Sequence, residues 1–197
     1  MKLKDKVAII TGAQRGIGFA IAERFVEEGA NVVLADIKNA EKEAAILRKS
    51  GCSVIYVETY VRDNAQVEAL VQKSLKEFGH IDILVNNASA EIAKTFPRTT
   101  EEEWGHLMAV NLKGVFLCSR AVIPHVEQHG HGIIINVASG LGLVSEAGVA
   151  AYCASKGGVV MLSKAMAIDH GPQGIRVNSL LPRTRNNTIT RRCVRQQ

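Results

Sequence analysis

The chain has 197 residues, of which 47% are hydrophobic and 22% charged, a composition that fits a folded globular protein and excludes a disordered or fibrous one. The formal charge of +5 would suit a nucleic-acid or membrane-surface protein, but five arginines in residues 183–197 supply the whole excess. We therefore expect no specific nucleic-acid partner. We also expect no membrane partner, because no apolar run approaches the length of a membrane span.

The length predicts one domain over residues 1–182, followed by a basic tail over residues 183–197. The apolar run near the N-terminus is too short for a signal peptide, so we expect a cytoplasmic protein. The four cysteines lack the spacing of a metal site or of a disulfide framework. His125, His129 and His131 are interpreted as part of a solvated loop at a helix end, and no metal site is assigned.

Short apolar runs alternate with amphipathic stretches along the chain. The expected strands are residues 7–11, 31–35, 53–57, 81–85, 132–137 and 175–180. The expected helices are residues 16–28, 40–49, 63–78, 100–127 and 150–170. Strands that are apolar on both faces and separated by helices predict a doubly wound parallel α/β sheet, with strand order 3-2-1-4-5-6. Ligands bind such sheets at the carboxyl ends of the strands, so the loops there are the place to look for chemistry.

A glycine-rich turn follows the first strand, with glycines at positions 12, 16 and 18. Such glycines allow the backbone to approach a pyrophosphate closely, and the next helix presents free N–H groups to that anion. Asp36 ends the second strand eighteen residues beyond Gly18. A carboxylate at that point can accept both hydroxyls of an adenosine ribose and repels a 2′-phosphate.

Arg15 has the opposite preference, because a guanidinium beside this turn could bind a 2′-phosphate. We expect Asp36 to decide the selectivity, since Arg15 can turn into solvent whereas a carboxylate at the ribose penalises the phosphate. The turn and Asp36 together therefore predict NAD as the cofactor in preference to NADP.

Tyr152 and Lys156 lie four residues apart in an expected helix and so share one of its faces. The unperturbed pKa of a phenol is about 10, and a neighbouring cation favours the phenolate. We therefore expect Lys156 to lower the pKa of Tyr152 and to make this side chain an acid/base group near neutral pH.

Five separate motifs, in order and spacing, resemble the short-chain dehydrogenase/reductase family. They are Thr11-Gly12-x-x-x-Gly16-Ile17-Gly18, Asn86-Asn87-Ala88, Asn111-Leu112-Lys113-Gly114, Ser139 and Tyr152-x-x-x-Lys156. The resemblance covers about residues 3–182 and implies a Rossmann-type fold and an NAD(P)-dependent oxidoreductase that interconverts a secondary alcohol and a ketone.

The resemblance also implies roles for single residues. Tyr152 would exchange a proton with the substrate oxygen, Ser139 would orient that oxygen, Lys156 would bind the nicotinamide ribose, and Asn111 would anchor a proton-relaying water. Cofactor contacts are implied for Gly12, Arg15, Gly16, Ile17, Gly18, Asp36, Val61, Asn87, Ala88, Tyr152 and Lys156. Taken singly, Ser139 also suits a turn cap, Asn111 a buried structural amide and Tyr152 a packed aromatic.

Two departures from the family pattern stand out. Ser89 replaces the usual glycine after Asn86-Asn87-Ala88, a change that we expect to be tolerated. After Pro182 the family continues with a glycine, a substrate-covering segment and a seventh strand, whereas residues 183–197 show no such pattern. We therefore expect a chain that is truncated or altered after Pro182, with an open substrate pocket and an unpaired strand edge.

Two functions remain open at this point. The first is an NAD-dependent dehydrogenase acting on a small-molecule alcohol or ketone whose identity the sequence does not specify. The second is a truncated, weakly active or inactive relative that serves at most as a cofactor-binding or interaction module. A homo-oligomer through the long helices fits either function, and the missing strand argues against a tetramer.

Overall fold

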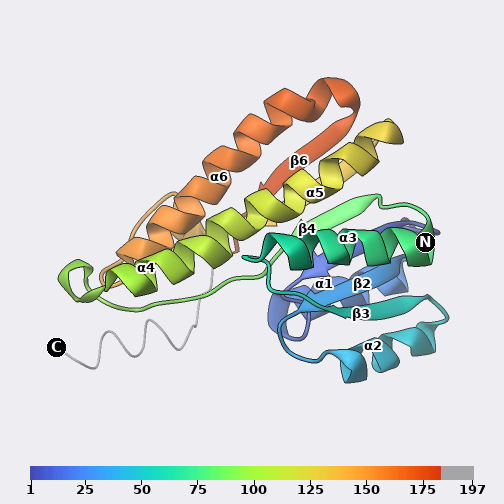
Figure 1. Ribbon diagram of the computed structural model, residues 1–197, viewed down its shortest axis with the longest axis horizontal. Coiled ribbons are helices and arrows are strands. Elements are labelled where there is room, and N and C mark those ends of the chain that lie inside the picture. Colours follow the sequence, from blue (N-terminus) through green and yellow to red (C-terminus); the bar gives the residue numbers. More distant parts are fainter. Residues whose placement is uncertain (183–197) are drawn as a thin grey trace.

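The computed structural model describes residues 1–182, and the expected basic tail lies outside the described residues. Six parallel strands form one sheet in the order β3-β2-β1-β4-β5-β6 (Figure 1). The strands are β1 Val7–Thr11, β2 Asn31–Asp36, β3 Val54–Glu58, β4 Ile83–Asn86, β5 Gly132–Val137 and β6 Ile175–Leu180. The predicted doubly wound sheet and its strand order are therefore confirmed.

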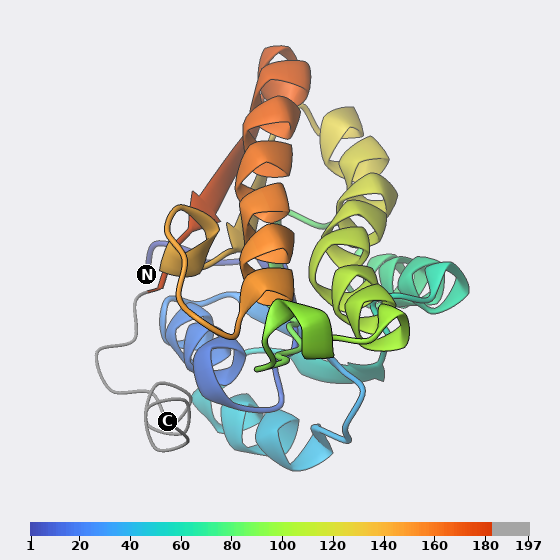
Figure 2. The same ribbon diagram turned by 90° about the vertical axis from the view of Figure 1, so that its left-hand side faces the viewer.

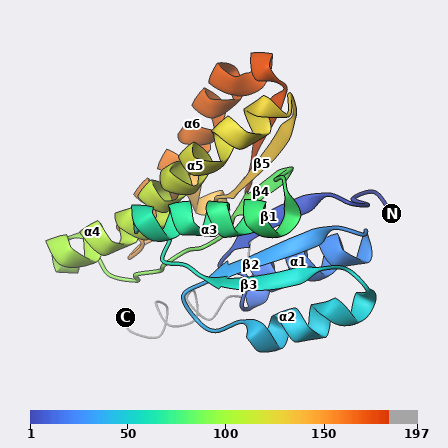
Figure 3. The same ribbon diagram turned by 45° about the vertical axis from the view of Figure 1, so that its right-hand side comes forward.

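Helices cover both faces of this sheet (Figure 3). They are α1 Gly16–Glu27, α2 Glu41–Leu47, α3 Asn64–Phe78, α4 Glu101–Met108, α5 Gly114–Gln128 and α6 Ala150–His170. The side chains of β1 alternate between two core clusters, as the period of a strand requires. Ile9 packs in the cluster that includes residues of α3, α5 and α6, whereas Ala8 and Ile10 pack in the cluster that includes residues of α1 and α2.

The second helix is shorter than predicted. It ends at Leu47, and the chain continues as a 3₁₀ turn over Arg48–Ser50. Gly51 follows with φ of 89°, a left-handed conformation that suits glycine and commonly ends a helix. The expected stop at Gly51 is correct, but the last turn before it is wound more tightly than an α-helix.

The expected helix over residues 100–127 is one continuous helix, Glu101–Gln128, which runs alongside α6 (Figure 2). Thr100 and Glu103 form the predicted capping box at its start. A π-helical turn, Ala109–Lys113, joins α4 to α5 in its middle. By length and composition this helix could cross a membrane, contrary to the expectation that no stretch approaches that length. Its buried residues belong to the core, since Leu117 and Val122 pack in the same cluster as the strands.

One part of the sheet has no helix over it among the described residues. On the face that α1 and α2 cover elsewhere, a hollow of about 560 Å³ lies over β5 and β6 and includes Ile133, Ile135 and Leu180. Ile133 is 40% exposed there. Within residues 1–182, β6 pairs only with β5. The unpaired edge of β6 that the sequence predicts stays a prediction, because residues 183–197 lie outside the described part of the chain.

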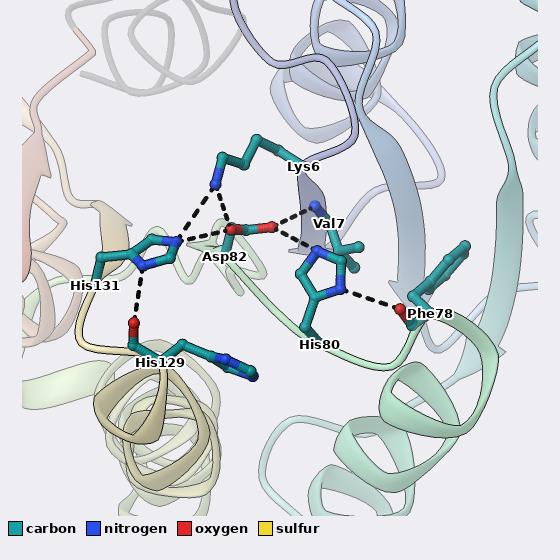
Figure 4. Close-up of polar contacts among 7 residues, drawn as sticks. All are labelled: Lys6, Val7, Phe78, His80, Asp82, His129 and His131. Carbon is teal, nitrogen blue, oxygen red and sulfur yellow. Dashed lines mark hydrogen bonds and ion pairs between the residues drawn. The ribbon is translucent and has the colours of Figure 1, made fainter.

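A buried carboxylate, Asp82, ties together the amino ends of the central strands (Figure 4). It accepts hydrogen bonds from Lys6 Nζ and from the Val7 backbone N–H, each at 2.8 Å, and contacts Nε2 of His80 and of His131, each at 3.2 Å. Burial alone would raise the pKa of Asp82, but the bonds from Lys6 and Val7 outweigh it and hold that pKa below its ordinary value. His131 is exposed, as expected, and its ring also contacts this carboxylate.

Candidate active site

Two different constraints, crowding and backbone conformation, require glycine in the turn between β1 and α1. A side chain on Gly18 would collide with the Gly12 carbonyl oxygen and lie 2.5 Å from the Asn87 amide nitrogen, and one on Gly12 would lie 2.8 Å from Ala88 Cα. At Gly16 the limit is the backbone, because φ is 62° while the space around it is open. Arg15 stands at the start of α1 and its side chain makes no capping bond. No side chain therefore caps the first N–H groups of α1, and they are free to bind an anion.

The loop after β4 is fastened to this turn by Asn87. Its side-chain nitrogen donates to the carbonyl oxygens of Thr11 and Gly12 at 3.0 and 2.9 Å. The backbone N–H groups of Asn87 and Ala88 both donate to Thr11 Oγ1, at 3.0 and 3.1 Å. The structure thus brings Asn87 and Ala88 to the predicted cofactor region, and it uses the Asn87 amide to hold two loops together.

Asp36 ends β2 with its carboxylate already fixed. One oxygen accepts a bond from the Gln14 backbone N–H and the other from the Lys38 backbone N–H, both at 3.0 Å. Arg15 is exposed to solvent beside the same turn. The Val61 side chain is 7% exposed and packs in the core against Gly114, and its contact with the cofactor stays a prediction. Two backbone N–H groups therefore hold the Asp36 carboxylate in place, and its contact with the ribose stays a prediction.

Asn111 lies in the π-helical turn and is fully buried. Its Oδ1 accepts a bond from the Ala90 N–H at 2.7 Å, and its Nδ2 donates to the Ala90 carbonyl at 3.0 Å and to Ser155 Oγ at 3.1 Å. The side chain therefore joins the loop after β4 to α6. Irregular helical turns of this kind are frequent at functional sites. These bonds support the structural reading of Asn111, and its role toward water stays a prediction.

Tyr152, Lys156 and Ser139 meet at the carboxyl ends of β5 and β6, where the fold rule places chemistry. Lys156 is 2% exposed, and its Nζ donates to the Val137 carbonyl at 2.8 Å and lies 5.7 Å from the centre of the Tyr152 ring. Ser139 caps the turn after β5 by accepting a bond from the Leu141 N–H at 3.1 Å. Capping and catalysis are compatible, because the Ser139 hydroxyl proton remains free to donate.

The electrostatics of this group correct one prediction. Burial lowers the pKa of Lys156 to about 8, and it raises the pKa of Tyr152 above the ordinary value. The hydroxyls of Ser139 and Ser89 oppose the shift at Tyr152, whereas the charge of Glu91 adds to it. The expected lowering of the Tyr152 pKa by Lys156 is therefore wrong for this structure, because burial dominates and the ammonium is held by a carbonyl.

Ser89 and Glu91 are the site residues that sequence reasoning missed. Both follow β4, and both act on Tyr152. Ser89 was treated only as a tolerated replacement of glycine, and Glu91 was not considered. Their position in the sequence could have identified them. Polar side chains just beyond the carboxyl end of a central strand lie where ligands bind in such sheets.

Known proteins are similar to this chain in sequence and in fold. The sequence model of the short chain dehydrogenase family matches residues 6–197, so the match continues past Pro182, where we expected the resemblance to end. The chain belongs to the short-chain dehydrogenase/reductase family. It is an oxidoreductase of the NAD(P)-dependent class acting on CH–OH groups, and its relatives are named as dehydrogenases.

Relatives from different organisms align over most of the chain. Meso-2,3-butanediol dehydrogenase of Serratia marcescens is 42% identical over 92% of this chain and 72% of its own length. A 3beta-hydroxysteroid dehydrogenase of Eggerthella lenta is 38% identical over 95% of this chain and 73% of its own. The crystal structure of an NAD⁺-bound xylitol dehydrogenase superposes with a TM-score of 0.90 at 32% identity, covering 92% of this chain and 71% of that one.

Proposed function

We propose that the chain is an NAD-dependent oxidoreductase that interconverts a secondary alcohol and a ketone, with Tyr152 as the acid/base group. The observation that carries this proposal is the meeting of the Tyr152 phenol with Ser139 and with the buried Lys156 at one edge of the sheet. Three titratable or hydroxyl groups at the carboxyl ends of parallel strands suit proton exchange with a substrate oxygen.

The residues of the first βα unit fit a dinucleotide. Gly16 leaves open space at the uncapped start of α1, where backbone N–H groups would hold the pyrophosphate. Asp36 is fixed by two backbone N–H groups, so it cannot move away from a 2′-phosphate without losing both bonds. This rigidity supports NAD over NADP. When bound, the nicotinamide supplies the hydride acceptor or donor, and the xylitol dehydrogenase structure carries NAD⁺ in the same fold.

The protein's own residues would handle the proton. Ser139 is held in place by the Leu141 N–H and can donate its hydroxyl proton to the substrate oxygen. Tyr152 would accept or return the proton of that oxygen. With a pKa of about 8, Lys156 gains or loses a proton readily near neutral pH and can relay charge beside the phenol.

Steady-state kinetics with a panel of alcohols tests this proposal. The panel contains meso-2,3-butanediol, xylitol and a 3β-hydroxysteroid, each with NAD and with NADP. We expect turnover with at least one alcohol, a higher kcat/KM with NAD, and a loss of about 10²- to 10⁴-fold in Tyr152→Phe. Ser50→Ala, in the 3₁₀ turn between α2 and β3, is the control and should keep full activity. Full turnover by Tyr152→Phe, or a preference for NADP, would overturn the proposal.

A second candidate function rests on the uncovered β5–β6 face. No helix covers that face among the described residues, and the hollow over it is lined by none of the proposed catalytic groups. If the wild-type chain turns over no alcohol but is stabilised by NAD in a thermal-shift assay, the cofactor-binding module is the better description. The cytoplasmic location and the oligomer through the long helices stay predictions.

A further inference from the structure

The turn that carries Ser139 is held together by its own hydrogen bonds. The Ser139 hydroxyl accepts a bond from the Leu141 N–H at 3.1 Å, and the Ser139 carbonyl accepts one from the Gly142 N–H at 2.9 Å. The Gly140 N–H donates to the Pro182 carbonyl at 3.3 Å, which ties the turn to the chain after β6. Ser139 and the three residues after it therefore move as one unit.

Lys156 contacts this segment of the chain on both sides of Ser139. On one side its Nζ donates to the carbonyl of Val137, the last residue of β5, at 2.8 Å. On the other side the Gly142 backbone lies very close to α6. A Cβ built on Gly142 would stand 2.8 Å from the Lys156 carbonyl oxygen and 3.1 Å from the Gly157 nitrogen. Ser139 thus lies, along the chain, between two contacts with one residue of the helix.

Crowding, and not backbone conformation, requires glycine at position 142. Its φ lies outside the left-handed region that favours glycine. The atoms that a Cβ would meet belong to the backbone of α6, a helix of 21 residues whose buried side chains, such as Val159 and Met166, pack in the core. An added methyl group must therefore displace the short turn and not the helix. The displacement is roughly half an ångström, because an ordinary contact begins near 3.4 Å.

We infer that Gly142 is a positioning residue for Ser139, because the absence of a side chain there sets how closely the Ser139 turn lies against α6. The inference rests on the proposed function, in which Ser139 orients the substrate oxygen that exchanges its proton with Tyr152. Reacting groups must be held within about 0.5 Å of their productive geometry, and a misplacement of about 1 Å can lower the rate about 100-fold. A methyl group on Gly142 would therefore separate the turn from α6 by enough to slow the reaction.

The test compares two glycines on opposite sides of the same contact. Gly142→Ala adds its methyl group against the Lys156 backbone, whereas Gly157→Ala adds one that meets the Gly142 carbonyl oxygen at 3.4 Å, an ordinary distance. We expect kcat/KM for the best alcohol of the panel to fall about 10- to 100-fold in Gly142→Ala and to stay within about twofold of wild type in Gly157→Ala. Both variants should unfold cooperatively on heating.

Coupling to Ser139 separates positioning from a general loss of stability. If Gly142 acts through Ser139, Gly142→Ala should lower kcat/KM by less than about threefold in a chain that already carries Ser139→Ala. A purely structural effect of Gly142 would lower kcat/KM equally in both backgrounds. Equal losses, wild-type turnover in Gly142→Ala, or loss of its cooperative unfolding would overturn the inference.

Crystal structures of the variants give a readout that needs no turnover. After superposition on α6, we expect Ser139 Cα to lie about 0.5 Å further from Lys156 in Gly142→Ala than in wild type, and to keep its place in Gly157→Ala. An unmoved Ser139 in Gly142→Ala would also contradict the inference. If Tyr152→Phe keeps full turnover while Ser139 is displaced in Gly142→Ala, the proposed function fails and the control of the turn by Gly142 stands.

Discussion

The two ends of the sheet treat their ionisable groups in opposite ways. At the amino ends, Asp82 is buried but surrounded by donors, and its pKa lies below the ordinary value (Figure 4). At the carboxyl ends, Lys156 is buried and Tyr152 is half-buried, both with fewer partners, and burial moves both toward their neutral forms. The amino ends use charge to hold strands together. At the carboxyl ends few partners stabilise the charged forms of these side chains. This lowers the stability of the fold but leaves their protons available for chemistry.

Removing the Asp82 carboxylate from the amino ends should have the largest effect on stability. Asp82→Ala leaves the Val7 N–H without its acceptor and Lys6 without its partner. We expect the free energy of unfolding, measured by urea denaturation, to fall by about 3 kcal/mol. Glu77→Ala, an exposed carboxylate on α3, is the control and should change little. A loss as small as that of the control would mean that the amino ends are held by packing alone.

The same carboxylate gives a pH dependence with a defined sign. Because the pKa of Asp82 is lower in the folded chain, its contribution is present above the unfolded value of about 3.8 and is lost as pH falls through the lower folded value. The stability difference between wild type and Asp82→Asn should therefore be constant near neutrality and shrink in acid. A difference that grew in acid would contradict this assignment.

Lys156→Met should act in the opposite direction on stability. A lysine whose folded pKa is about 8 destabilises the folded chain at neutral pH, and this cost disappears as pH rises toward 10.5. We expect the variant to be about 1 to 2 kcal/mol more stable at pH 7, to lose that advantage in alkali, and to lose turnover. Lys164→Met, on the exposed side of the same helix, is the control. A less stable Lys156→Met would show that the bond to the Val137 carbonyl outweighs burial.

His80 should have the smallest effect. Its Nδ1 faces the Phe78 carbonyl at 3.1 Å and its Nε2 faces Asp82 at 3.2 Å, and both partners only accept hydrogen bonds. A neutral imidazole has one N–H, so both bonds form together only in the protonated ring. We expect His80→Gln to cost about 0.5 kcal/mol, a loss that disappears in the Asp82→Asn background. Equal losses of stability in both backgrounds would show that His80 does not act through Asp82.

The fold was predictable because its signals are local. Alternating apolar runs and helix-ending glycines such as Gly79 specify strands and helices within a few residues of each position, and the handedness of crossovers then limits the strand order. The π-helical turn around Asn111 was not predictable, since a bond to Ala90, twenty-one positions earlier in the chain, accompanies it.

The sequence predicted that Tyr152 and Lys156 lie together, but it did not predict their electrostatics. The spacing of Tyr152 and Lys156 placed them on one helix face, yet their pKa values depend on how deeply the sheet buries them. The Asp82 cluster escaped prediction for a related reason. Its members Lys6 and His131 are 125 positions apart and meet only because β1, β4 and β5 are neighbours in the sheet.

The pairing of β1 with β4 has a consequence for the growing chain. Ala8 pairs with Ile83, so a ribosome that has released only β1, β2 and β3 has made half a sheet with one side of β1 unpaired. That side stays a template for foreign strands until residues 83–86 emerge and Asp82 reaches the Val7 N–H. Slow emergence of residues 83–86 would therefore lengthen the time in which nascent chains can aggregate.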